Sequence, residues 1–179
     1  MTNRKKLVTE MGRIDRDAFA QSQKLPLVVV LDNVRSLHNV GSVFRTSDAF
    51  RVERIILCGI TATPPSAEIH KTALGAEDVV DWKYYESTMD AVAELRSQGY
   101  RIYSIELCQG SIALQDFVTA PGERYAVVLG NEVKGVQQDV VDASDGAIEI
   151  PQFGTKHSLN VSVTAGMVIW EFAKKLGLV

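Results

Sequence analysis

The sequence predicts an α/β domain in which a parallel sheet carries helices on both faces. The first observation is a set of short apolar runs rich in valine, which is typical of strands buried on both sides. The second is that these runs alternate with segments of helical periodicity. The third is that unusual polar loops follow three of the runs, within residues 31–45, 127–136 and 150–162. Ligands bind beyond the carboxyl ends of parallel strands, so the three loops predict one composite site.

The expected strands share short length, apolar character and flanking turn residues. They are residues 27–31, 54–58, 79–82, 101–106, 125–129 and 147–150. The first of them is a continuous Leu/Val run, so we expect a strand that is buried on both faces.

The expected helices share apolar residues at helical spacing and recognisable ends. Pro26 follows the first helix, Gly99 stops the fourth and Gly177 ends the last. The helices are residues 3–22, 39–50, 66–74, 88–98, 136–141 and 158–176.

Length and composition predict one domain, residues 25–179, preceded by a basic helical extension, residues 1–24. The hydrophobic fraction of 46% is enough for a core. The sequence contains no run of 18 apolar residues, so no membrane span is expected. The N-terminus lacks an apolar signal core, so we expect a cytoplasmic protein. Cys58 and Cys108 then fit reduced thiols better than a disulfide.

Charge is unevenly distributed along the chain. The net charge is −3, which weakly disfavours a general nucleic-acid coat protein. Residues 1–24 hold six basic and three acidic side chains, giving +3 there and −6 on the remainder. Such an extension can guide a polyanion to a local site, although charge alone favours a solvated amphipathic helix.

The segment after the first strand concentrates asparagine, arginine, histidine and glycine. We expect Asn39 to cap the helix that follows. Gly41 and Arg45 are four positions apart and share one helical face, where glycine permits close approach of a backbone or a ligand. Pairing of Arg45 with Asp48 or Glu53 is the structural alternative, and spacing alone does not decide between them.

The second segment runs from a buried strand into Gly130, an acid at Glu132 and Gly135. It is not a phosphate loop, because Val136 stands where Lys-Ser/Thr is required. No G-x-G-x-x-G motif follows any expected strand, which weakens a dinucleotide interpretation. The structural alternative is a tight turn in which Glu132 is an incidental surface acid.

The third segment leaves a strand at Pro151, passes through a glycine loop with Lys156 and His157, and enters a helix at Ser158. Small polar side chains at a helix start lie beside free N–H groups that can hold a ligand. Ser158 also fits a plain N-cap. Asn160 fits a first-turn residue less well, because asparagine is a poor choice within an apolar helix start.

Two site classes are disfavoured. His38, His70 and His157 are far apart and lack metal-ligand spacing, so no metal is expected. A Ser–His–Asp hydrolase is disfavoured because no G-x-S-x-G elbow is present.

Together the segments resemble the signature motifs of the SpoU (TrmH-like) RNA ribose methyltransferases of the SPOUT superfamily. The resemblance covers about residues 25–176 and includes the stretch 71–76. The matching residues are Asn33, Asn39, Gly41 and Arg45 in the first motif, Gly130, Glu132 and Gly135 in the second, and Ile150, Pro151, Gly154, Ser158, Leu159, Asn160 and Ser162 in the third.

The resemblance implies a fold whose C-terminal part is threaded into a trefoil knot, and a homodimer. It implies S-adenosylmethionine as cofactor, bound in a bent form within the knot. By position, Gly130, Ile150 and Leu159 match residues whose loops hold this cofactor, and Leu107 is expected to line the same cavity.

The implied reaction is methylation of a ribose 2′-hydroxyl in tRNA or rRNA. Arg45 matches the family's catalytic arginine. Because arginine stays protonated, we expect it to bind the adjacent phosphate and stabilise the developing alkoxide rather than act as a base. Asn33, Glu132, Ser158 and Asn160 are expected to position Arg45, the ribose and the cofactor. In the family the arginine can come from the partner subunit.

The chain also departs from the family pattern. Ser36-Leu37 replaces the common Asn/Asp-Pro, and Gln152 replaces a common Met. No separate N-terminal RNA-binding domain is expected, and the basic extension would serve instead. Two other functions stay open: a non-catalytic RNA-binding or assembly module on the same fold, and another kind of nucleotide-binding α/β enzyme.

Overall fold

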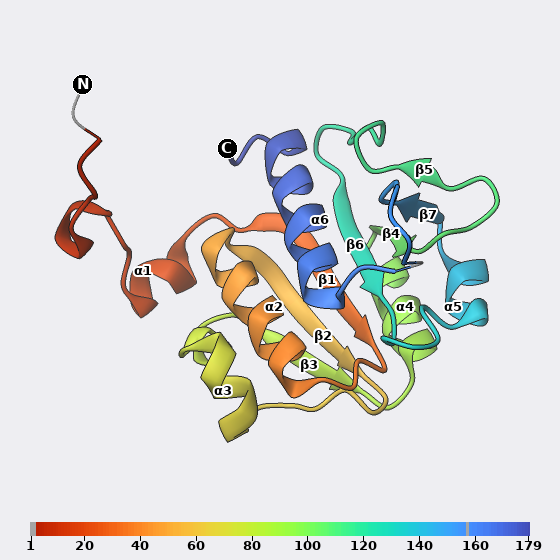
Figure 1. Cartoon of the computed structure of the whole chain (residues 1–179), viewed down its shortest axis with the longest axis horizontal. Coiled ribbons are helices and arrows are strands. Elements are labelled where there is room, and N and C mark those ends of the chain that lie inside the picture. The colour runs from red at the N-terminus through yellow and green to blue at the C-terminus, as the bar shows by residue number, and fades with distance from the viewer. Residues whose placement is uncertain (1–2, 157) are drawn as a thin grey trace.

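The computed structural model describes residues 3–156 and 158–179 (Figure 1). Its seven strands form one parallel sheet in the order β3-β2-β1-β6-β4-β7-β5. The strands are β1 (Leu25–Asp32), β2 (Val52–Cys58), β3 (Trp82–Tyr85), β4 (Tyr100–Ile105), β5 (Ile112–Ala113), β6 (Arg124–Leu129) and β7 (Gly146–Glu149). The predicted parallel α/β sheet is therefore confirmed.

Helices cover both faces of the sheet, as predicted (Figure 1). Helices α2, α3 and α6 pack on one face and α4 and α5 on the other. The helices are η1 (Val8–Glu10), α1 (Arg16–Gln21), α2 (Leu37–Ala49), α3 (Ala67–Ala73), η2 (Ala76–Asp78), α4 (Thr88–Ser97), α5 (Gln138–Ala143) and α6 (Val161–Lys175). Among the helices of the described ranges, none is long and apolar enough to cross a membrane.

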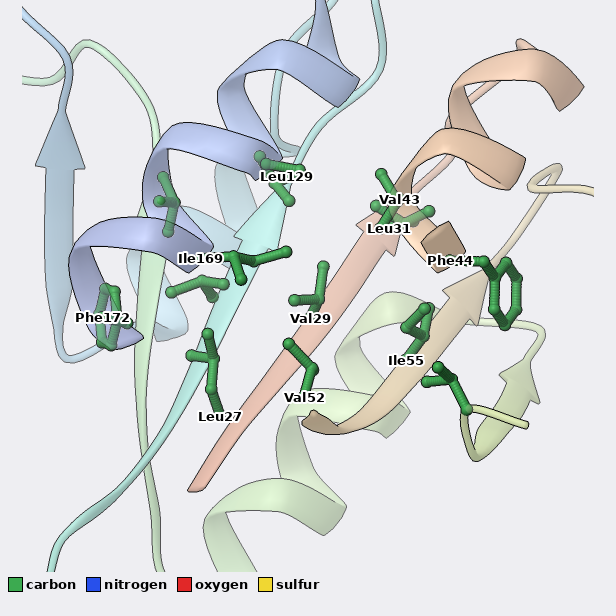
Figure 2. Packing of buried hydrophobic residues seen from close by; sticks show 14 of the residues in the cluster. Leu27, Val29, Leu31, Val43, Phe44, Val52, Ile55, Leu129, Ile169 and Phe172 are labelled. Atoms are coloured by element: carbon green, nitrogen blue, oxygen red, sulfur yellow. The ribbon is translucent and has the colours of Figure 1, made fainter. Parts of the chain in front are cut away.

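Strand β1 lies between the two apolar clusters of the core, and this position accounts for its valine-rich sequence. Leu27, Val29 and Leu31 belong to the cluster under α2 and α6 (Figure 2). Val28 and Val30 alternate with them and belong to the cluster under α4 and α5. Successive side chains of a strand point to opposite faces, so a strand covered on both sides must be apolar at every position.

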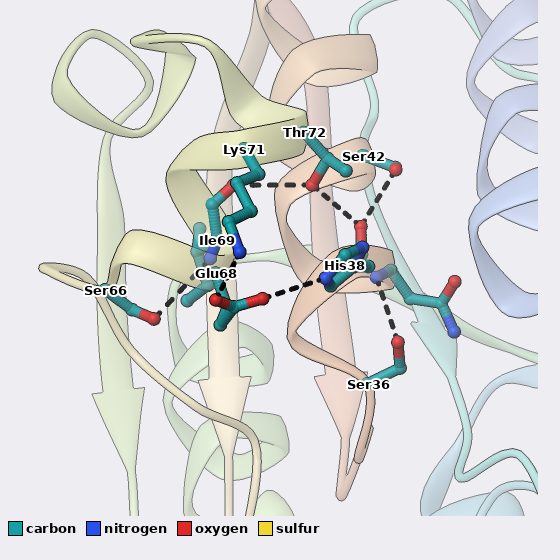
Figure 3. Close-up of polar contacts among 9 residues, drawn as sticks. Ser36, His38, Ser42, Ser66, Glu68, Ile69, Lys71 and Thr72 are labelled. Carbon is teal, nitrogen blue, oxygen red and sulfur yellow. Dashed lines mark hydrogen bonds and ion pairs between the residues drawn. The ribbon is translucent and has the colours of Figure 1, made fainter.

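Helices α2 and α3 cross in close contact at Gly41. A Cβ at Gly41 would lie 2.1 Å from Thr72 Oγ1 and 2.3 Å from the Ile69 carbonyl oxygen. The Thr72 and Ser42 hydroxyls both donate to the His38 carbonyl, at 2.9 and 2.8 Å (Figure 3). Of the two partners predicted for this glycine, the structure places a backbone against it.

Charged side chains extend the contact between α2 and α3 at the surface. Glu68 lies 3.1 Å from His38 Nε2 and accepts a 2.6 Å hydrogen bond from Lys71 Nζ (Figure 3). These side chains are exposed, so water screens the pairs and they contribute little to stability. The close approach at Gly41 therefore decides how the two helices pack.

The prediction of a continuous helix over residues 3–22 is wrong. The extension forms only the short η1 and α1, and Gly12 between them has a left-handed φ of 61°. Leu7, Met11 and Ile14, which suggested an amphipathic helix, are exposed, and the segment extends away from the sheet (Figure 1). Short helices need a packed apolar face for stability, and these residues have no such surface in one chain.

Other elements also differ from the expected ones. The strand expected at 79–82 is β3 at Trp82–Tyr85, because the Val79 and Val80 N–H groups donate to the Ala76 carbonyl in the turn that ends η2. The two-residue β5 was not expected, since so short a strand has no periodicity. Helix α2 begins before Asn39, because the Ser36 side chain accepts from the Asn39 N–H and is the N-cap. The expected capping role of Asn39 is therefore wrong.

Candidate active site

Glu132 connects the first and second polar segments. Its Oε2 accepts a 2.9 Å hydrogen bond from the Arg35 N–H. Its Oε1 accepts from the Ser36 N–H at 3.0 Å and from Asn39 Nδ2 at 3.1 Å. One carboxylate thus satisfies backbone donors at the start of α2 and orients the amide of Asn39.

Asn39 continues this connection to the third segment. Its Oδ1 accepts from Asn160 Nδ2 at 3.1 Å and lies 3.4 Å from the Ser162 hydroxyl. A chain of hydrogen bonds therefore runs from Glu132 through Asn39 to Asn160. The three loops meet beyond the carboxyl ends of β1 and β6, as the sequence predicted.

Asn160, not Ser158, caps the last helix. Its Oδ1 accepts from the Ser162 and Val163 N–H groups at 2.8 and 3.3 Å, so α6 begins at Val161. The predicted helix start at Ser158 is wrong for this reason. An amide has both an acceptor and a donor end, so Asn160 caps the helix with its oxygen and reaches Asn39 with its nitrogen.

Glu132 is held in its ionised form. Burial acts to raise the pKa of this carboxyl. Hydrogen bonds from Arg35, Ser36 and Asn39 lower the pKa by more than burial raises it, so the pKa of Glu132 lies below the ordinary value. A carboxylate that accepts three N–H groups is a poor proton donor at neutral pH. Glu132 is thus suited to ordering the site and not to transferring a proton.

Asn33 lies outside the Glu132–Asn39–Asn160 chain. It has a left-handed φ of 57°, and its side chain accepts from the Ile60 N–H at 3.1 Å and donates to Asp32 at 2.9 Å. Its carbonyl accepts from Asn131 Nδ2 at 2.8 Å. Asn33 therefore shapes the loop, whereas Asn39, expected only as a motif residue and a cap, lies inside the site.

A cavity of about 470 Å³ opens at the carboxyl ends of β4, β6 and β7. Leu107, Gly130, Ile150 and Leu159, the four residues expected at the cofactor, all line it. Glu132 and Ser158, two of the expected catalytic residues, line it as well. The volume of the cavity lies in the range of small-molecule sites.

The chemistry of the cavity wall fits a nucleoside-type cofactor. Leu107, Val136, Ile150 and Leu159 supply apolar surface, which can cover the faces of a purine ring. A Cβ at Gly130 would lie 2.1 Å from the Gly135 backbone, so this wall is built of closely folded main chain. Main-chain N–H and C=O groups there can bond the edge of a base and the ribose hydroxyls.

Arg45 lies apart from the cavity within one chain. It is exposed on α2 and does not line the cavity. Within residues 3–156 and 158–179 it forms no ion pair with Asp48 or Glu53, and Glu53 instead pairs with Arg124 at 2.5 Å. The structural alternative for Arg45 is therefore not realised, and its guanidinium is available to a ligand.

The remaining candidate groups are accounted for as follows. Both cysteines are free, as expected; burial raises the pKa of the Cys58 thiol to about 12, and Cys108 lines the cavity. In the described part of the chain no group of three or more His, Cys, Asp or Glu side chains is placed to hold a metal ion. His157 of the glycine loop lies outside the described residues.

Two curated relatives match nearly the whole chain. The 23S rRNA (guanosine-2′-O-)-methyltransferase RlmB of Vibrio parahaemolyticus is 30% identical over 172 residues, covering 96% of this chain and 68% of the relative. The tRNA (guanosine(18)-2′-O)-methyltransferase of Aquifex aeolicus is 30% identical over 158 residues, covering 87% of this chain and 72% of the relative. The chain thus spans about two thirds of the length of these relatives.

The fold is also similar to solved structures. An AdoMet-bound rRNA methyltransferase from Sinorhizobium meliloti superposes with a TM-score of 0.78 at 27% identity, covering 90% of this chain and 60% of that one. The family model described as the SpoU rRNA Methylase family matches residues 26–170. The second and third motifs line one cavity, and the first is joined to them by the hydrogen bonds of Asn39. This chain belongs to the SpoU rRNA methylase family, as the motif resemblance predicted.

Proposed function

We propose that this protein transfers a methyl group from S-adenosylmethionine to a ribose 2′-hydroxyl of RNA. The observation that carries the proposal is the hydrogen-bonded chain Glu132–Asn39–Asn160 beside the 470 Å³ cavity. The relatives support it, because one is named for 23S rRNA and the other for tRNA, both at a guanosine 2′-oxygen. The substrate class is accordingly tRNA or rRNA.

Leu107, Gly130, Ile150 and Leu159 hold the cofactor in this proposal. When bound there, S-adenosylmethionine supplies an electrophilic methyl group on a sulfonium. The apolar side chains exclude water around it, and the main chain at Gly130 gives directional contacts. The solved relative with bound AdoMet supports the same cofactor here.

A ribose hydroxyl is a weak nucleophile, so the protein must orient it in line with the methyl group and favour loss of its proton. Ser158 lines the cavity, and Asn160, two residues further along the third segment, is hydrogen-bonded to Asn39. In this proposal both side chains orient the ribose. Glu132 keeps Asn39 and the start of α2 in position, and Asn33 supports the loop beneath them.

Arg45 contributes from a second copy of the chain in this proposal. It is exposed and lies off the cavity of its own chain, so a partner subunit is needed to bring a guanidinium to each cavity. Val163, Met167 and Trp170 are exposed at helical spacing on α6 and supply an apolar face for a homodimer. Once there, Arg45 binds a phosphate beside the reactive ribose and stabilises the alkoxide.

We further propose the trefoil knot, the domain division and the cellular location. In the sheet, β7 is separated from β1 by β4 and β6, but α6, which follows β7, packs on β1 and α2. The chain therefore passes back over β4 and β6, near the loop that follows β6. This path supports a knot. Residues 25–179 are the catalytic domain, and the basic residues 1–24 contact RNA. An enzyme for tRNA or rRNA acts in the cytoplasm, where we place it.

The test is transfer of labelled methyl from S-adenosylmethionine into total RNA of cells that lack this protein, followed by size separation and nuclease digestion. Label in a nuclease-resistant dinucleotide establishes ribose methylation, and the size of the labelled RNA identifies tRNA or rRNA. Binding of RNA with neither label nor cofactor binding would instead favour the non-catalytic module. Competition by ATP or NAD would favour another nucleotide enzyme.

A further inference from the structure

Two carboxylates, from the strands on either side of β6, accept hydrogen bonds from consecutive main-chain N–H groups. Glu106, just after β4, accepts from the Val136 N–H through Oε2 at 3.0 Å. Asp32, at the end of β1, accepts from the Gln137 N–H through Oδ2 at 2.9 Å. Strand β6 lies between β1 and β4, so the loop that follows it, residues 130–136, is held from both sides at its C-terminal end.

Asp32 is an unusually well-satisfied buried charge. Its exposed fraction is 0%, and besides the Gln137 main chain it accepts from three side chains. These are Gln137 Nε2 at 2.8 Å, the Thr88 hydroxyl at 2.6 Å and Asn33 Nδ2 at 2.9 Å. A buried carboxylate is tolerated only with such a set of donors, and the set leaves it no freedom to move.

Glu106 fits the loop by close contact as well as by hydrogen bonds. Its Oε1 accepts from the Leu107 N–H at 3.0 Å. A Cβ at Gly135, where φ is +70°, would lie 2.2 Å from Glu106 Oε2. Only glycine allows the loop to lie on this carboxylate in that conformation.

The 130–136 loop is closed on itself, so its attachments decide its orientation. Asn131 and Gly135 exchange main-chain hydrogen bonds of 3.0 and 2.9 Å. Gly130, whose Cβ would meet the Gly135 backbone at 2.1 Å, and Glu132 both line the cavity, and Glu132 also accepts from Asn39. A tilt of this unit would displace both the cavity wall and Glu132.

We propose that Asp32 and Glu106 are a pair of positioning residues that fix the 130–136 loop for cofactor binding and for alignment of Glu132. The inference rests on the proposed function and deepens it. Glu106 also lines the cavity, whereas Asp32 does not, so a change in cofactor affinity in Asp32→Asn can arise only through the loop. Each supplies a fixed acceptor to one of two successive N–H groups at the start of α5, where Gln137 itself provides no side-chain cap.

The test compares S-adenosylmethionine affinity, measured by calorimetry, and single-turnover methyl transfer in Asp32→Asn and Glu106→Gln. Each variant keeps the shape of the side chain but weakens a charge-assisted hydrogen bond. We expect the Kd for S-adenosylmethionine to rise by about tenfold to a hundredfold in each. The RNA concentration that half-saturates single-turnover transfer should stay unchanged. In the double variant we expect an increase smaller than the product of the two, because both act on one loop.

Asp145→Asn is the matched control. Asp145 Oδ2 accepts a main-chain hydrogen bond from Ile102 at 2.8 Å in the same sheet, and Asp145 does not line the cavity. We expect it to lower the melting temperature while the Kd stays within twofold of the wild type. Equal melting losses in all three variants, with the Kd unchanged in all, would show a purely structural role and overturn the proposal.

A compensating exchange gives a second readout. In Asp32→Asn combined with Gln137→Glu, the new carboxylate can accept from the new amide, so we expect the Kd to recover by at least threefold over Asp32→Asn alone. If Asp32→Asn does not fold, Gln137→Ala and Glu106→Gln provide the same comparison with the control. Absence of cofactor binding by the wild type would instead refute the proposed function itself.

Discussion

Asn160 Nδ2 donates to Asn39 Oδ1 at 3.1 Å, joining two asparagines that lie 121 positions apart in the sequence. Asn39 at the same time donates to Glu132, so its amide is used at both ends. This arrangement makes Asn39 the residue through which the start of α6 and the start of α2 share one geometry.

Replacement of Asn39 by alanine is expected to reduce methyl transfer by about a hundredfold, because Glu132 loses a donor and Asn160 loses an acceptor. Cofactor affinity should change by less than fivefold, since Asn39 does not line the cavity. Single-turnover transfer and calorimetry measure the two quantities.

Asn33→Ala is the comparison variant. It should mainly lower the free energy of unfolding, by about 1–3 kcal/mol, because the Ile60 N–H loses its acceptor. A larger loss of turnover in Asn33→Ala would reverse the assignment.

Replacement of Arg45 by alanine is expected to abolish transfer and leave cofactor binding intact, because Arg45 is exposed and away from the cavity. Mixed dimers of Arg45→Ala and Asn160→Ala chains provide the sharper measurement. If Arg45 acts across the dimer, one of the two sites in each mixed dimer is complete, and activity returns above that of either variant alone. Inactive mixed dimers would place Arg45 at the cavity of its own chain.

Replacement of Gly41 by alanine is expected to lower the free energy of unfolding by about 1–3 kcal/mol, because the new methyl group would press on the Ile69 carbonyl and Thr72. Urea denaturation measures the change. Gly166→Ala in α6 is the control, since its Cβ would meet no atom of the described residues within 4 Å. There alanine should stabilise by about 0.5–1 kcal/mol through helix propensity. Equal effects at both positions would contradict the close α2–α3 packing.

The lowered pKa of Glu132 predicts a pH dependence of stability. Because the folded pKa lies below the unfolded one, the stabilising contribution is present above the ordinary value of 4.5 and is lost as the pH falls through the folded pKa. We expect Glu132→Gln to make the free energy of unfolding less steeply dependent on pH below 4.5. Urea denaturation from pH 3 to 7 measures this dependence in the wild type and in Glu132→Gln. The same dependence in both proteins would show that the hydrogen bonds of the folded state do not lower the pKa of Glu132.

The sequence by itself determined the architecture and the location of the site. The alternating apolar runs specify strands buried on both faces, as Val28 and Val29 show by facing opposite clusters. Since all the strands are parallel, the segments that follow β1, β6 and β7 must emerge at one edge of the sheet. Local periodicity and chain direction are sufficient for both conclusions. Leu107 and Ile150, which only the family resemblance assigned to the cofactor, line the same cavity.

Only the tertiary structure decided which polar side chains meet there. Asn33 and Asn39 are equally plausible in the sequence, but the partners of Asn39 lie 93 and 121 positions away. The hydrogen bond from the Gln137 N–H to Asp32 joins residues 105 positions apart. Hydrogen bonds between residues so far apart in the sequence leave no periodic pattern in it, because only the folded structure brings the two partners together. The same reason explains the wrong helix over residues 3–22: its apolar spacing was real, but a helix needs a surface to pack against, and packing is decided in three dimensions.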